Sequence, residues 1–210
     1  MKNVVKISIL TATIAVAMIF FGGCSKDENP SLVSGSFNGT VAATVEGGAS
    51  LTVNAVLAMN EAGINAGVFD GNVIGTGAAF NNGSFSITLP TSGLSSYLMD
   101  VTAFFEYFMQ AGDKGKIKVS NPSARVMDVD FFGFYVDSEE NVYVKGFFTY
   151  KTTDKATTCM FVYSDSDVNV TGSANVSVSL KEGWNRVYLS SKITTKAPDG
   201  MTWYFDSSNF

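Results

Sequence analysis

The chain has 210 residues, 19 acidic and 14 basic side chains, a formal net charge of −5 and no histidine. The lack of histidine excludes a Ser-His-Asp triad, a Cys-His pair and zinc sites with imidazole ligands. No Gly-rich phosphate loop follows a predicted strand, and an acidic chain without a Lys/Arg cluster is poorly suited to neutralise the phosphates of nucleic acid. We therefore expect no enzyme activity, no cofactor and no nucleic-acid partner.

Residues 1–23 have the pattern of a signal peptide. Lys2 and Lys6 precede an apolar run from Ile7 to Phe21, which is shorter than the roughly twenty residues needed to cross a bilayer. The run ends in Phe21-Gly22-Gly23-Cys24, where small residues let a peptidase reach the backbone and the thiol can accept a diacylglycerol. We expect cleavage before Cys24 and lipidation of Cys24. Loss of two lysines and no acid changes the net charge from −5 to −7.

This lipobox, followed by Ser25-Lys26-Asp27-Glu28, resembles the start of a surface-exposed lipoprotein of the Bacteroidota type. The resemblance covers about the first thirty residues and implies a protein held in the outer membrane by lipid and exposed on the cell surface. Two or more acyl chains attach a protein stably, whereas one chain binds reversibly. A solvated charged tether is the alternative interpretation of the same four residues.

Residues 24–35 contain Asn29-Pro30-Ser31 and are expected to form a flexible tether, with the folded domain covering 36–210. The polar stretch Lys114–Ser123 leaves open a division into two lobes, 36–112 and 113–210. Only one other cysteine, Cys159, is present, so no disulfide is possible once Cys24 is acylated. We expect Cys159 to be a small apolar residue in a buried strand.

The first half of the domain has the alternation and turn residues of β-structure. Strands are predicted over Phe37–Val45, Leu51–Leu57, Val73–Phe80 and Ser84–Leu89. Asn81-Asn82-Gly83 predicts a hairpin between the last two, because Asn-Gly adopts positive φ at low cost. The stretch from Gly83 to Pro90 also resembles a hairpin of transthyretin-like and related immunoglobulin-like β-sandwich modules, which implies a sandwich for the N-terminal part.

The segment 95–110 is ambiguous, because a helical and a strand periodicity both give an entirely apolar face. Its length favours an amphipathic helix, which Ser95 or Ser96 would cap and Gly112 would end.

The second half predicts further strands. They cover 125–136, 142–150, 159–163, 168–170, 175–180, 186–191 and 201–205, with a bulge or close approach at Gly146 and a turn at Gly183-Trp184-Asn185. With the first half this makes ten to twelve antiparallel strands, and we expect an all-β antiparallel β-sandwich.

Three groups of side chains could form a site. Asp128 and Asp130 lie two apart on one strand face, but neighbours on one strand cannot flank a sugar as glycosidase acids do, so a solvated face is favoured. Asp165, Asp167 and Asn169 match the first half of a calcium loop, although Val170 and Val176 replace its Gly and Glu. Trp184, in a predicted turn, could stack on a sugar, whereas Trp203 is expected in the core.

The sequence thus predicts a non-catalytic surface lipoprotein, bound to the membrane through Cys24, that binds a glycan or protein ligand. The alternative is a structural subunit of an adhesin or pilus, with Thr202-Trp203-Tyr204-Phe205 as the strand donated to a neighbour. The sequence leaves the oligomeric state open.

Overall fold

The computed structural model of the protein describes residues 32–36, 52–57, 73–79, 84–109, 113–138, 141–172 and 175–206. The predicted signal peptide, Cys24 with the four residues after it, the strand predicted over 37–45, the turn Asn81-Asn82-Gly83 and the helix end at Gly112 lie outside the described residues. The described part is mostly β-strand with one short helix, as predicted for an all-β protein.

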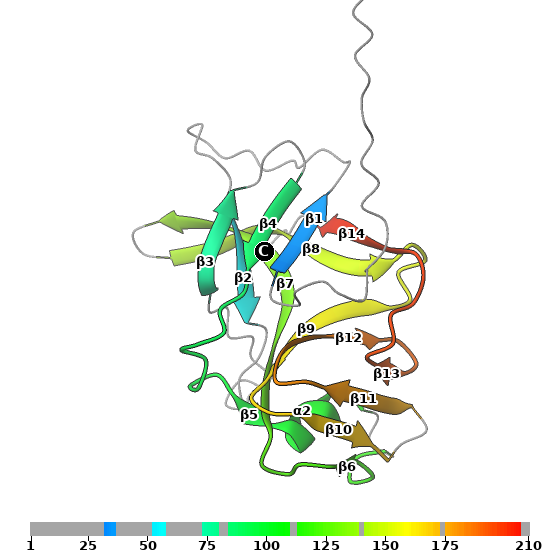
Figure 1. Ribbon diagram of the computed structural model, residues 1–210. Helices are drawn as coiled ribbons and strands as arrows, with labels where there is room; N and C mark the ends of the chain where they lie inside the picture. Colours follow the sequence, from blue (N-terminus) through cyan, green and yellow to red (C-terminus); the bar gives the residue numbers. More distant parts are fainter. Residues whose placement is uncertain are drawn as a thin grey trace, which may run out of the picture.

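Fourteen strands and one helix are described, and Figure 1 shows their arrangement. In chain order they are β1 (Leu32–Ser36), β2 (Thr52–Leu57), β3 (Val73–Ala79), β4 (Ser84–Thr88), β5 (Met99–Asp100), α2 (Val101–Tyr107), β6 (Lys118–Val119), β7 (Arg125–Ser138), β8 (Asn141–Thr152), β9 (Thr158–Ser164), β10 (Val168–Thr171), β11 (Val176–Leu180), β12 (Gly183–Leu189), β13 (Ile193–Thr194) and β14 (Met201–Asp206).

The long strand β7 connects the two ends of the molecule, because each half of it has different neighbours (Figure 1). Residues 125–129 pair with β5 and β9, whereas residues 131–138 pair with β2 and β8; Val129 lies at the junction and is also opposite Leu57 of β2. Strands from before and after residue 113 therefore belong to one sheet.

Two hydrophobic cores lie on opposite faces of β9 and β12. Successive side chains of β9 are all buried from Cys159 to Val162, and alternate side chains of a strand point to opposite faces. The aromatic core, on the face of Phe161, contains Ile74, Phe85, Ile87, Leu89, Leu94, Met127, Val129, Phe132, Cys159, Phe161, Trp184 and Tyr188. The valine-rich core, on the face of Val162, contains Met99, Val101, Phe104, Phe105, Ala124, Val126, Met160, Val162, Val168, Val170, Val176, Val178, Leu180, Val187 and Ile193.

The sheet curls around the valine-rich core. Its order from β9 onward is β12, β13, β11, β10 and β6, and the apolar sides of β10 and β11 share this core with β9 and β12. Helix α2 lies in the same region as β10 and β11 at the lower end of the molecule (Figure 1), and Val101, Phe104 and Phe105 are its fully buried residues. The helix thus fills the concave side of the curled sheet.

The predicted helix over 95–110 exists but is shorter. Residues Ser95 and Ser96, expected at its start, lie in a turn. The helix begins after Asp100, whose carboxylate accepts a hydrogen bond of 2.9 Å from the amide of Ala103. It ends at Phe108 instead of near Gly112. The strand β5 immediately before it pairs with β7, and this pairing fixes where the helix can begin.

The hairpin predicted between 73–80 and 84–89 is wrong in its pairing. Strand β3 pairs with β2, and β4 pairs with β1 in a separate two-stranded sheet. Leu32 lies opposite Thr88, so residues predicted to belong to the tether form a strand. The expected domain boundary at Ser36 therefore lies at the end of β1, and the folded part begins no later than Leu32.

The bulge predicted at Gly146 is confirmed. Phe134 lies opposite Gly146 and Tyr135 lies opposite Val144, so β8 has one extra residue at this point. A second register shift occurs where β2 passes β7 near Val129, which changes the face to which the following residues of β7 point.

The turn between β8 and β9 is held by its own side chains. The Asp154 carboxylate accepts hydrogen bonds from the Thr152 hydroxyl at 2.5 Å and from the Ala156 amide at 3.0 Å. These bonds, that from Thr152 first, lower the pKa of Asp154. Lys155 has a φ of 59°, and its ammonium lies 4.9 Å from the centre of the Tyr204 ring on β14.

Candidate functional site

Trp184 is part of the aromatic core, so the expectation that it would be exposed is wrong. The residue belongs to strand β12, and its side chain is 3% exposed. Its indole Nε1 donates a hydrogen bond of 2.7 Å to the carbonyl of Pro90, and its ring packs edge-on against Tyr163. Because the ring is covered and its donor is satisfied, Trp184 has no free face on which a sugar could stack.

Trp203, expected in the core, is half-buried on β14. Its ring contacts the rings of Phe85, Phe132, Tyr150 and Phe161. The segment Thr202–Phe205, proposed above as a donor strand, pairs with β8 of its own chain, where Trp203 lies opposite Tyr150. Strand donation to a neighbour stays a prediction.

The carboxylates of the suggested calcium loop bind other protein groups. Asp165 accepts hydrogen bonds from the Arg125 amide at 3.0 Å and the Ser166 hydroxyl at 2.9 Å. Asp167 accepts from the ammonium of Lys181 at 2.6 Å and from the Glu182 amide at 2.9 Å. The Lys181 hydrogen bond, followed by that from Glu182, lowers the pKa of Asp167. The two carboxylates thus fasten the turn between β9 and β10 to neighbouring segments.

Asn169, the third residue of that pattern, is exposed on β10, and its backbone amide bonds to the Ser120 hydroxyl at 2.9 Å. Within the ranges that the structure describes, no three His, Cys, Asp or Glu side chains lie close enough together to hold a metal ion.

Asp128 does not lie on a solvated strand face, as the sequence suggested, but is fully buried. It lies opposite Val162 of β9, on the face of the valine-rich core. The alternation of Asp128 and Asp130 with apolar residues indicated one solvated face, but this part of β7 is covered on both faces. The structure does not describe the side chain of Asp130.

Cys159 is buried in β9 and belongs to the aromatic core, which confirms the expectation for this residue. Its thiol is 1% exposed. A covered thiol among apolar side chains has a packing role and is not accessible to a substrate.

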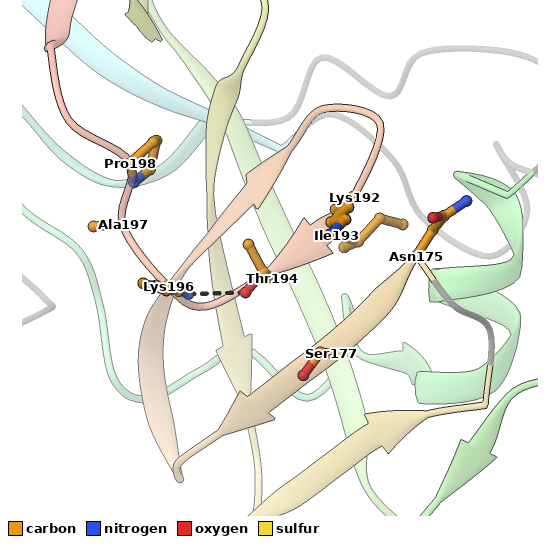
Figure 2. Close-up of a pocket in the computed structure, with 8 residues that line it drawn as sticks. All are labelled: Asn175, Ser177, Lys192, Ile193, Thr194, Lys196, Ala197 and Pro198. Carbon is orange, nitrogen blue, oxygen red and sulfur yellow. Dashed lines mark hydrogen bonds between the residues drawn. The ribbon is translucent and has the colours of Figure 1, made fainter.

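A pocket of about 370 Å³ opens on the outer side of β11 and β13. Figure 2 shows that β11 contributes one edge, with Asn175 just before the strand, and that β13 and the segment after it contribute the other. The residues that line it are Asn175, Ser177, Lys192, Ile193, Thr194, Lys196, Ala197 and Pro198. They place amide, hydroxyl and ammonium groups around a lining surface that is mostly apolar.

Short parallel pairing positions this pocket. Ser177 lies opposite Thr194, and both point outward because their neighbours Val176 and Ile193 point into the valine-rich core. The amide of Ile193 donates a hydrogen bond of 2.7 Å to the carbonyl of Asn175. The two edges of the pocket are therefore joined through their backbones.

The backbones of the two lysines are fixed, whereas their ammonium groups are exposed. The amide of Lys196 donates to the Thr194 hydroxyl at 3.0 Å, and the amide of Lys192 donates to the Ser190 hydroxyl at 3.1 Å (Figure 2 shows the first). Among the described residues, neither ammonium forms an ion pair, unlike those of Lys116 and Lys181. In the part of the chain that the structure describes, no acidic side chain lines the pocket.

Sequence reasoning missed this pocket. Lys192 and Lys196 lie in a short polar stretch that resembles any solvated loop, and β13 has only two residues. The signal that was available is the spacing of two lysines around Thr194 in an otherwise acidic chain. That spacing indicates a site only once β11, whose paired residues lie seventeen positions earlier, is placed beside β13.

The described part of the chain contains no helix long and apolar enough to cross a membrane. Comparison with known proteins finds no matching family model, no matching curated protein and no matching solved structure. The function is therefore argued from the residues alone.

Proposed function

We propose that this protein is a non-catalytic lipoprotein of the outer-membrane surface, attached through Cys24, whose β-domain binds an extracellular ligand. The observation that carries the proposal is the lipobox Phe21-Gly22-Gly23-Cys24 with the charged residues directly after it. The lack of histidine and the burial of Asp128 and Cys159 support a binding role over a catalytic one, because a buried carboxylate and a buried thiol are not accessible to a substrate.

The position of β1 adds a geometric consequence. Seven residues lie between Cys24 and Leu32, the first described residue of the folded part, so eight Cα–Cα steps join the two. A fully extended chain spans at most about 3.4 Å per residue, so β1 would begin within about 27 Å of a lipidated Cys24. The domain would then sit close above the membrane, where it could meet polymers at the cell surface.

We also propose that the curled sheet is a variant of the antiparallel sandwich, with an immunoglobulin-like or transthyretin-like N-terminal part. The support is the valine-rich core, in which Val168 and Val178 on one side share a cluster with Val162 and Val187 on the other. Strands that bury apolar residues between two facing layers define this architecture.

Cell fractionation tests the anchoring part of the proposal. In cells that express the full-length protein, it should sediment with membranes and be degraded when protease is added to intact cells. The Cys24→Ala variant should appear in the soluble fraction. Because Cys159 is buried, Cys159→Ser serves as the control and should stay with the membrane. Retention of the Cys24→Ala variant in the membrane would refute the anchor, and resistance to external protease would refute the surface location.

A further inference from the structure

The pocket between β11 and β13 has the chemistry of an anion site. Lys192 and Lys196 are both exposed and unpaired among the described residues, and both line a pocket without a carboxylate. The chain as a whole has an excess of acidic residues. In an acidic protein, two cations that form no ion pair among the described residues leave a local positive potential that favours a negatively charged ligand.

The uncharged groups around the lysines restrict the ligand further. Asn175, Ser177 and Thr194 provide an amide and two hydroxyls, which can donate or accept hydrogen bonds with the hydroxyls of a sugar. Ala197 and Pro198 provide an apolar surface on the same side. A volume of about 370 Å³ lies within the roughly 300–1,000 Å³ that is usual for sites of small ligands, and is far smaller than the footprint of a folded partner.

We propose that this pocket binds an anionic saccharide unit, with the ammonium groups of Lys192 and Lys196 contacting its carboxylate or sulfate. The inference rests on the proposed function and names the ligand class. The ammonium groups form charge-assisted hydrogen bonds with the anion, while Asn175, Ser177 and Thr194 contact the ring hydroxyls. Neutral saccharides lack the anion and bind more weakly.

The test measures binding of the full-length protein, purified in a nonionic detergent, to four immobilised probes by biolayer interferometry. Polygalacturonate carries carboxylates, dextran sulfate carries sulfates, dextran is neutral, and polyglutamate is an acidic peptide. We expect binding to one or both anionic polysaccharides and little binding to dextran. The two anionic probes show whether the pocket prefers a carboxylate or a sulfate.

Variants place this binding at the pocket. An exposed ion pair contributes up to about 1 kcal/mol, which corresponds to about five-fold in affinity, so Lys192→Ala with Lys196→Ala should weaken binding roughly ten- to thirty-fold. The matched control, Lys114→Ala with Lys118→Ala, removes two exposed lysines that do not line the pocket and should leave affinity within about two-fold.

Exchange of both pocket lysines for arginine retains the charge and should restore most of the affinity. Raising the salt concentration should weaken the parent protein more than the alanine pair, because screening acts on the contacts that the pair has lost.

Three results would overturn the inference. They are equal loss of affinity in the control pair, polyglutamate bound as tightly as the anionic polysaccharides, and binding of an anionic polysaccharide that the pocket variants do not weaken. In the last case the protein still binds a surface ligand, so the proposed function stands while the assigned pocket is wrong. If no probe binds and a broad glycan and protein screen is also empty, the ligand-binding function itself fails.

Discussion

Replacement of Trp184 by alanine should destabilise the fold, because its indole is a packed part of the aromatic core. The side chain is 3% exposed, contacts Tyr163 and donates a hydrogen bond to the Pro90 carbonyl. Truncation of a buried Trp to Ala costs about 3–5 kcal/mol, and the loss of the hydrogen bond leaves a half-covered carbonyl without this donor. We expect a loss of about 4 kcal/mol, which for a chain of this length lowers the melting temperature by roughly 8–16 °C.

Urea unfolding followed by far-UV circular dichroism measures this loss without relying on the fluorescence of the residue that is removed. The matched control is Tyr107→Ala, which removes an aromatic side chain that is 45% exposed on α2 and should cost less than about 1 kcal/mol. If Trp184→Ala were as stable as the control, the indole would not be buried and the reasoning on the aromatic core would be refuted. Such a result would return Trp184 to consideration as a sugar-stacking residue.

Three further predictions concern the backbone, pH and the thiol. Gly172 and Gly93 both have positive φ, 113° and 74°, but a Cβ at Gly172 would lie 2.0 Å from a backbone oxygen, whereas a Cβ at Gly93 would meet nothing within 4 Å. Gly172→Ala should therefore lower the free energy of unfolding, measured in urea, by at least about 3 kcal/mol. Gly93→Ala, the control, should lower it by only about 1–2 kcal/mol. Hydrogen bonds lower the folded-state pKa of Asp154 and Asp167 below 3.8, so the two carboxylates stabilise the fold above that pH and lose this contribution as the pH falls through the lower folded-state pKa. The melting temperature should therefore decrease when the pH is lowered below about 4. The decrease should be smaller in a variant with Asp→Asn exchange at both positions. The Cys159 thiol is 1% exposed and should react with Ellman's reagent only after urea unfolds the protein, so rapid reaction of the folded protein would contradict its burial.

Local sequence patterns predicted those features that depend on neighbouring residues. Strand β2, the bulge at Gly146 and the burial of Cys159 follow from alternation or residue type, and the existence of α2 follows from the length of its apolar segment. Such signals are local, and the structure confirms them.

Features that depend on partners distant in the sequence were not predictable in this way. The pairing of β4 with β1 joins residues 48 to 56 positions apart, and the nearby Asn-Gly dipeptide favoured a hairpin instead. Asp128 and Trp184 were expected at the surface because one alternates with apolar residues and the other follows a glycine. Burial of both depends on the curl of the sheet and on the segment that contains Pro90, neither of which a local pattern contains.

The functional features show the same contrast between local and long-range signals. The lipobox is a contiguous signal and could be recognised from the sequence, whereas the pocket depends on the parallel pairing of β11 with β13, which brings Ser177 beside Thr194. A parallel pair needs a long connection, so no turn signal marks it in the sequence. The strand β12 lies within that connection.

Mass spectrometry of the N-terminal peptide from the protein in its native membrane tests the central claim most directly. The account predicts a chain that begins at Cys24, with a thioether-linked diacylglycerol on the sulfur and a further acyl chain on the amine. A chain that still begins at Met1 and carries an unmodified thiol at Cys24 would contradict the membrane anchor, and with it the surface location on which the binding role is built.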